Sequence, residues 1–127
     1  MTSAAEKGRA AEEVALDYLR AKGLELVESN YRCRLGEIDL ILKDDDELVV
    51  AEVRLRSSGR FGTPAETITG RKRNRIIRAT LHFISTRPEF RDAPVRFDVV
   101  AIDRRAGQLR SEWIRDAFRA DDTMSDW

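Results

Sequence analysis

The chain has 127 residues, which is enough for one domain with a moderate hydrophobic core. Hydrophobic residues make up 42% of it and charged residues 36%, and 23 basic side chains balance 23 acidic ones. This composition is typical of a soluble protein, and the net charge of zero argues against strong nonspecific binding to nucleic acid. The single cysteine excludes an internal disulfide, and no apolar run approaches the roughly 18 residues that span a bilayer, so we expect a cytoplasmic protein.

The first predicted element is a helix over residues 8–22. Gly23 supplies the left-handed cap that ends it. Glu12 lies beside the first turn of the buried stripe, where a carboxylate suits the helix dipole and stays solvated. Residues 1–7 are expected to be flexible. The apolar or small side chains at helical spacing are Ala11, Val14, Ala15, Tyr18 and Leu19.

A strand over residues 24–34 follows, with a bend near Asn30. Cys33 lies in this strand, and we interpret it as a small packing residue. Arg32 and Arg34 lead into the next strand. Two roles are open for these arginines: contact with phosphate, or neutralisation of Glu37.

Residues 35–42 and 48–56 alternate apolar and polar side chains, which predicts two strands. The acidic segment 43–47 has turn composition, so the strands form an antiparallel hairpin. A turn centred on Asp45 and Asp46 places Asp39 directly across from Glu52, with Arg54 on the same face. We expect one apolar face on each strand, formed by Ile38, Leu40 and Leu42 and by Val49, Ala51, Val53 and Leu55.

The predicted opposition of Asp39 and Glu52 requires compensation. Directly opposed residues in a hairpin have Cβ atoms roughly 4.5–5.5 Å apart, and like charges there repel. A divalent cation is the simplest solution, because Mg²⁺ is commonly held by one or two carboxylates, with water and substrate phosphate as further ligands. Arg54 would then bind a phosphate oxygen. The alternative is a solvated strand face on which Asp39 or Glu52 pairs with an arginine.

Residues 57–64 are rich in Gly, Ser and Pro and predict a loop. This loop either connects a strand to a helix or lets Arg60 and its glycines approach a nucleic acid strand. A helix is predicted within residues 66–87, capped near Thr69 and ending before Pro88. Its early basic cluster is either a solvated face or steers phosphate. We interpret His82 as helix packing, and the core side draws on Ile76, Ile77, Thr80, Leu81, Phe83 and Ile84.

Residues 96–103 predict a last strand with apolar side chains on both faces, as in a strand inside a covered sheet. Residues 111–120 predict a short helix, and residues 121–127 are expected to be flexible. The whole chain, 1–127, is therefore expected to be one α/β domain. Its mixed four-stranded sheet contains an antiparallel hairpin and is flanked by helices.

Two resemblances add to this interpretation. Asp39 with Glu52-Val53-Arg54 resembles the Asp…Glu-x-Lys core of the PD-(D/E)XK nuclease superfamily. Over residues 8–118 the chain resembles the YraN family of uncharacterised bacterial proteins. The motifs that carry this second resemblance are Gly8-Arg9-Ala10-Ala11-Glu12, Asn30-Tyr31-Arg32, Gly36-Glu37-Ile38-Asp39-Leu40-Ile41, Glu52-Val53-Arg54, Phe61-Gly62, Lys72, Arg96-Phe97-Asp98-Val99 and Asp116-Ala117-Phe118.

The superfamily likeness implies a restriction-endonuclease-like core that hydrolyses phosphodiester bonds with Mg²⁺ or Mn²⁺. It implies that Asp39 and Glu52 are metal ligands, and it makes Glu12 a third candidate ligand. Arg54 stands in the place of the catalytic lysine. An arginine can stabilise charge in the transition state but stays protonated, so it does not handle protons. The expected contacts to nucleic acid, DNA by resemblance, are Arg32, Arg56, Arg60, Arg71 and Lys72.

Two classes of function follow from these observations. In the first, the protein is a metal-dependent nuclease with Asp39, Glu52 and Arg54 as catalytic residues. In the second, the same fold has kept a nucleic-acid surface but little chemistry and acts as a binding or accessory module. A protein-interaction domain is a third class. The superfamily likeness extends to archaeal junction resolvases, which work as symmetric dimers, so the resemblance implies a homodimer as one expected state, although no stretch specifies a dimer face.

Overall fold

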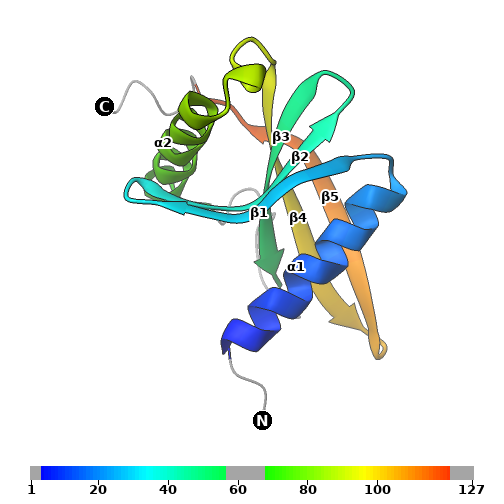
Figure 1. The fold of residues 1–127 in the computed structure, drawn as a ribbon. Coiled ribbons are helices and arrows are strands. Elements are labelled where there is room, and N and C mark those ends of the chain that lie inside the picture. The colour runs from blue at the N-terminus through cyan, green and yellow to red at the C-terminus, as the bar shows by residue number, and fades with distance from the viewer. Residues whose placement is uncertain (1–3, 57–67, 121–127) are drawn as a thin grey trace.

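The computed structural model describes residues 4–56 and 68–120, and these form an α/β structure around a five-stranded mixed sheet in the order β1-β2-β3-β4-β5 (Figure 1). None of the helices in this part of the chain is long and apolar enough to cross a membrane. The elements in chain order are α1 (Ala4–Ala21), β1 (Glu25–Cys33), β2 (Gly36–Asp44), β3 (Glu47–Leu55), α2 (Gly70–Thr86), the 3₁₀ helix η1 (Pro88–Phe90), β4 (Val95–Arg105) and β5 (Gln108–Phe118).

The β2–β3 hairpin has the predicted register. Leu40 pairs with Ala51 at one end of the ladder, and Asp44 pairs with Glu47 at the other. Asp45 occupies the turn with a φ of 54°. Aspartate tolerates this left-handed conformation, so the acidic segment closes a tight turn.

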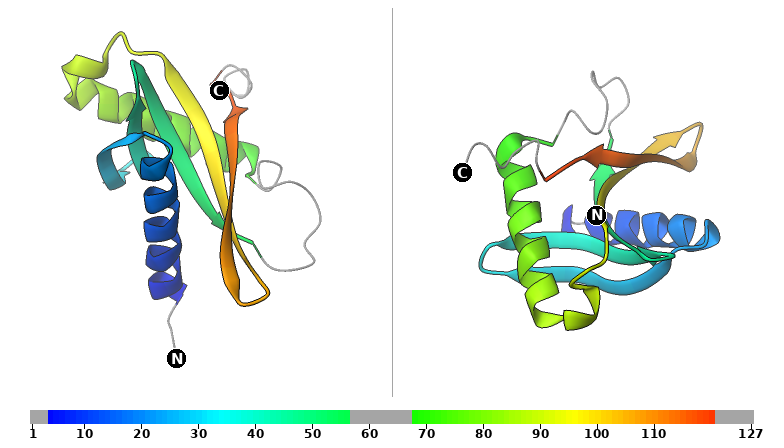
Figure 2. Two further views of the ribbon diagram at one scale, coloured as in Figure 1. Left: turned by 90° about the vertical axis from the view of Figure 1, so that its right-hand side faces the viewer. Right: turned by 90° about the horizontal axis from the view of Figure 1, so that it is seen from above.

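Helices cover the sheet on opposite faces, α1 on one and α2 on the other (Figure 2). The alternative of a solvated hairpin face is therefore wrong for the centre of the hairpin, because residues 40–42 and 48–52 are buried on both faces. Full burial of each large aliphatic side chain contributes about 1.5–3 kcal/mol. The α1 side buries Ala11, Ala15, Leu19, Leu40, Leu42, Val49, Ala51, Val100 and Ile102. The α2 side buries Ile38, Ile41, Leu48, Val50, Ile76, Ile77, Phe83, Phe97 and Val99.

Ile38 departs from the predicted face, since it packs on the α2 side whereas Leu40 packs on the α1 side. The change of side occurs where the neighbouring strand β1 bends. Asn30 adopts a φ of 54° at this bend, between the pairs Ser29–Leu40 and Tyr31–Ile38. The predicted bend near Asn30 is confirmed, and it lies directly across the ladder from Asp39.

Helix α2 begins and ends as predicted. Thr69 is its N-cap, and the Thr69 hydroxyl accepts a hydrogen bond from the backbone N–H of Lys72 at 3.2 Å. Leu81 was expected on the core side and His82 as helix packing, but neither side chain is buried. Leu81 is 55% exposed, and His82 is exposed, with its Nδ1 hydrogen-bonded to the Tyr31 hydroxyl.

Strand β4 runs parallel to β3 and antiparallel to β5, so it lies inside the sheet as predicted. The helix expected over residues 111–120 is wrong, since residues 108–118 form the strand β5, which gives the sheet a fifth strand. Phe97 pairs with Phe118 and Val99 with Ile114, so two residue steps on β4 face four on β5. Asp116, with a φ of 52°, lies in this bulge.

A buried ionic network joins β4 to β5 and to the β2–β3 turn. Asp98 is fully buried and accepts hydrogen bonds from Arg96 Nε at 2.9 Å, Trp113 Nε1 at 2.9 Å and the backbone N–H of Asp116 at 2.9 Å. Arg96 also donates to Glu47 at 2.9 Å. Both oxygens of this carboxylate accept hydrogen bonds, so the network fixes the path of β5 beside β4.

Candidate functional site

Asp39 and Glu52 meet at the point where β2 and β3 stop pairing. The ladder ends at Leu40 and Ala51, one step before the two acids. Beyond it, Asp39 Oδ2 accepts a hydrogen bond from the backbone N–H of Val53 at 2.9 Å, so a side chain replaces the missing strand partner. The two carboxyl groups are also hydrogen-bonded to each other. The predicted juxtaposition of Asp39 and Glu52 is therefore present in the fold.

Lys72 supplies the cation beside this pair. Its Nζ lies 2.8 Å from Glu52 Oε1, and its side chain is 42% exposed whereas that of Glu52 is 7% exposed. Lys72 is the third residue of α2, and the Thr69 cap fixes the backbone from which it extends. The ammonium group thus stands between a buried carboxylate and solvent. The role predicted for Lys72 was a contact with phosphate, and its contact with Glu52 was not predicted.

The environment raises the pKa of both acids. Burial raises the pKa of Glu52 to about 7, the charge of Asp39 adds to this rise, and Lys72 opposes it. Burial also raises the pKa of Asp39, while the hydrogen bond from Val53 opposes that rise. Because each carboxyl group acts on the pKa of the other, Asp39 and Glu52 titrate as a pair. Perturbed acids in contact with a basic residue are typical of functional sites.

Glu12 joins the same group from α1. Its Oε1 is buried and has no hydrogen-bond partner among residues 4–56 and 68–120. Burial and the charge of Asp39 raise the pKa of Glu12, and a hydrogen bond with the Asn30 side chain opposes the rise. A buried carboxylate oxygen without a partner is costly. Oε1 of Glu12 is therefore a candidate ligand atom for a cation.

The other predicted site residues that the structure describes form no hydrogen bond or ion pair with Asp39 or Glu52 that it shows. Within the described residues, 4–56 and 68–120, the structure shows no hydrogen bond or ion pair of Arg54. Arg56 pairs with Glu112 at 3.1 Å, and Arg32 pairs with Glu37 at 3.5 Å. The ion pair between Arg32 and Glu37 is one of the two roles that the sequence left open for Arg32, namely neutralisation of Glu37. Arg71 is exposed near the start of α2, and Arg60 lies outside the described residues.

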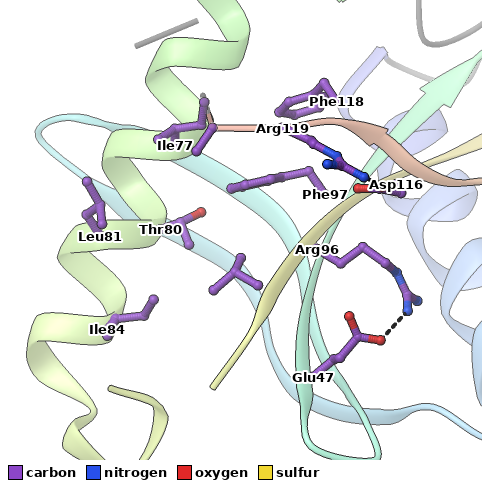
Figure 3. A pocket seen from close by; sticks show the side chains of 12 residues that line it. Glu47, Ile77, Thr80, Leu81, Ile84, Arg96, Phe97, Asp116, Phe118 and Arg119 are labelled. Atoms are coloured by element: carbon purple, nitrogen blue, oxygen red, sulfur yellow. Dashed lines mark hydrogen bonds and ion pairs between the residues drawn. The ribbon is translucent and has the colours of Figure 1, made fainter. Parts of the chain in front are cut away.

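A groove of about 540 Å³ lies between α2 and strands β4 and β5 (Figure 3). Ile77, Leu81 and Ile84 of α2 line it together with Phe97 of β4 and Phe118 of β5. Its lining includes none of Glu12, Asp39, Glu52 and Lys72. The groove is therefore separate from the carboxyl pair.

Comparison with known proteins identifies the family. The sequence model of the uncharacterised protein family UPF0102 matches residues 11–102, which is most of the chain. The chain belongs to the UPF0102 family. A UPF0102 protein of Nitrosococcus oceani is 47% identical to it over 116 residues, covering 91% of this chain and 94% of that protein.

Further UPF0102 proteins match over nearly their whole length. One from Nitrosomonas europaea is 48% identical over 119 residues, with 93% of this chain and 98% of that protein covered. Another, from Legionella pneumophila subsp. pneumophila, is 45% identical over 115 residues, with 91% and 96% covered. The UPF0102 match spans Glu12, Asp39, Glu52 and Lys72, so all four residues lie within the family's own domain.

Proposed function

We propose that this UPF0102 protein is a metal-dependent nuclease with a restriction-endonuclease-like fold that hydrolyses phosphodiester bonds. The observation that carries the proposal is the pair of buried, mutually hydrogen-bonded acids, Asp39 and Glu52, at the end of a strand ladder. A purely structural role would favour full pairing with cations. Instead one lysine contacts the pair, and burial raises the pKa of both acids.

The donor set fits a hard divalent cation such as Mg²⁺ or Mn²⁺. Asp39, Glu52 and Glu12 offer only carboxylate oxygens, which these ions prefer. The unpartnered Oε1 of Glu12 is the atom whose burial a cation would explain. No group of three His, Cys, Asp or Glu side chains in the described part of the chain is already arranged as a metal cage. Metal binding requires Asp39 and Glu52 to be ionised, so a proton held by Glu52 must leave. A bound ion would supply Lewis acidity and a more acidic water.

Lys72 takes the role that the superfamily gives to the lysine two residues after the glutamate. Its ammonium contacts Glu52 from the solvent side, where a phosphate oxygen approaches. There it can stabilise negative charge that develops on the phosphoryl group. A lysine can also transfer a proton, which Arg54 cannot. Arg54, on the same strand as Glu52, keeps the phosphate-binding role predicted for it.

A nucleic-acid-binding module without efficient chemistry is the second candidate. One observation favours it, namely that the ammonium of Lys72 is engaged with Glu52 and Arg54 occupies the usual lysine position. On this reading, the ion pair replaces the metal. The two candidates make opposite predictions for metal binding.

The test combines metal binding and cleavage. Calorimetry measures Mn²⁺ binding to wild type, Asp39→Asn, Glu52→Gln and Lys72→Met, and each protein is then incubated with labelled branched, flapped, single-stranded and duplex DNA. We expect wild type to bind Mn²⁺ and cut. Asp39→Asn and Glu52→Gln should lose both properties, and Lys72→Met should keep Mn²⁺ binding but lose cleavage.

Glu13→Gln is the matched control, because Glu13 lies next to Glu12 on α1 but is exposed. It should behave as wild type. Mn²⁺ binding that is unchanged in Asp39→Asn and Glu52→Gln would refute the metal site. Arg54→Lys is tested in the same assays. If wild type does not bind Mn²⁺ and does not cut, whereas Arg54→Lys cuts, the binding module would be favoured.

A further inference from the structure

The outer face of α2 carries a straight line of basic side chains. Arg71, Arg75, Arg78 and His82 are spaced by four, three and four residues, so they fall on one helical stripe. All four are exposed, and the stripe is opposite the buried face that contains Ile76, Thr80 and Phe83. We call these four residues the α2 stripe.

The charge of α2 is unfavourable for the helix itself. Residues 70–86 contain no Asp or Glu, and their cations are Arg71, Lys72, Arg73, Arg75 and Arg78. Most of these lie in the first two turns, where the helix dipole is positive and acidic residues are normally preferred. The protein as a whole has a net charge of zero, so the concentration of positive charge here is local. Such a departure from the local rule indicates a functional surface for an anionic partner.

A second element extends this surface. The turn between β1 and β2 packs directly on α2, since a Cβ at Gly36 would lie 2.5 Å from the carbonyl oxygen of Arg75. This turn carries Arg34, which is exposed. Lys72 connects the surface to the candidate site, because it belongs to the first turn of α2 and contacts Glu52.

From this arrangement we infer that the α2 stripe binds the phosphate backbone of duplex DNA and guides it to the site of Asp39 and Glu52. This inference rests on the proposed function and names its substrate class. The rise from Arg71 to Arg78 is about 10 Å, and one strand of a duplex carries a phosphate about every 3.4 Å along its axis. The stripe therefore matches a short run of phosphates on one strand.

A duplex fits the stripe better than a single strand. Proteins that bind single strands combine cations with aromatic side chains on which bases stack. No Phe, Tyr or Trp lies between Arg71 and Arg78. The guanidinium groups suit phosphate, which they bind in a fork geometry, and give no base readout. Binding should accordingly be independent of sequence.

The experiment is a salt titration of binding to a labelled duplex in EDTA, with wild type and Arg75→Gln plus Arg78→Gln. The slope of log K against log salt should fall by about 1.8 in the double variant, at roughly 0.9 for each phosphate contact. The same relation predicts roughly 60-fold weaker binding at 0.1 M salt. Arg20→Gln plus Arg110→Gln removes the same charge from exposed positions on α1 and β5, and it should keep the wild-type slope.

Each outcome decides the inference. An unchanged slope in the double variant overturns it, as does equal or tighter binding of a single strand of the same length. No duplex binding by wild type at 50 mM salt also overturns it and leaves an acidic protein surface as the partner. Because the titration contains no metal, a protein that shows the predicted slopes but neither binds Mn²⁺ nor cuts refutes the nuclease proposal alone.

Discussion

Replacing Glu52 by glutamine should stabilise the metal-free protein at alkaline pH. The folded protein holds the Glu52 proton up to a pKa of about 7, whereas the unfolded chain releases it near the ordinary value of 4.5. Between these values the native state binds more protons than the unfolded state, so the free energy of unfolding falls as pH rises. Above pH 7 the buried carboxylate is ionised, and its full cost is present. Glutamine stays neutral at every pH and can still donate a hydrogen bond to Asp39.

The magnitude follows from the two pKa values. At about 1.4 kcal/mol per pH unit, a rise from 4.5 to about 7 corresponds to roughly 3 kcal/mol. The side chain of Glu52 is 7% exposed, so solvent screening reduces this little. Lys72 loses its partner in the variant, but its side chain is 42% exposed and water can replace the contact. We therefore expect the two proteins to be similar at pH 5 and Glu52→Gln to be more stable by about 2–3 kcal/mol at pH 8.

Urea denaturation in EDTA, monitored by circular dichroism from pH 5 to 8, measures this difference. Subtracting the variant from wild type at each pH cancels the titrating groups that do not interact with Glu52, so the difference reports Glu52 together with its neighbour Asp39. Glu13→Gln provides the control, because this exposed position should give a difference that does not change with pH. A wild type that matches or exceeds Glu52→Gln in stability at pH 8 would refute the reasoning, since the buried carboxyl would then carry no cost.

Three further substitutions probe the frame around the site. Asp98→Asn should lower the free energy of unfolding by about 1–3 kcal/mol, because it removes the buried carboxylate that accepts from Arg96 and Trp113, although Arg96 keeps Glu47 as a charged partner; urea denaturation measures this, and an unchanged free energy of unfolding would contradict it. Gly36→Ala should cost about 1–3 kcal/mol, since its Cβ would meet the Arg75 carbonyl oxygen at 2.5 Å; unchanged thermal unfolding would show that the turn moves away freely. Thr69→Ala should cost about 1 kcal/mol by removing the cap of α2, and Thr69→Ser should restore most of it in the same assay.

The hairpin and both helices could be predicted because their signals are local. Alternation and the acidic turn fix the β2–β3 register, and with it the meeting of Asp39 and Glu52. Thr69 and Pro88 bracket α2 in the sequence. These features depend on neighbouring residues only, so no knowledge of packing was needed.

Strand β5 could not be predicted from its spacing. Trp113, Ile114, Ala117 and Phe118 recur at helical intervals, yet the interval from Ile114 to Phe118 arises from a bulge. Bulges insert residues that break the two-residue period, and the sequence does not mark them. The contact between Lys72 and Glu52 could not be predicted from the sequence either, because it depends on how α2 packs on the sheet.

The candidate site draws on four separate segments of the chain. Glu12 comes from α1, Asp39 from β2, Glu52 from β3 and Lys72 from α2. A folding intermediate that contains only the β2–β3 hairpin would hold the two central acids, because that contact is local. Glu12 and Lys72 arrive only when a helix has docked on each face, and such non-local contacts form late. All four residues come together only in the fully folded chain. A partly folded chain would hold Asp39 and Glu52 together without Glu12 and Lys72.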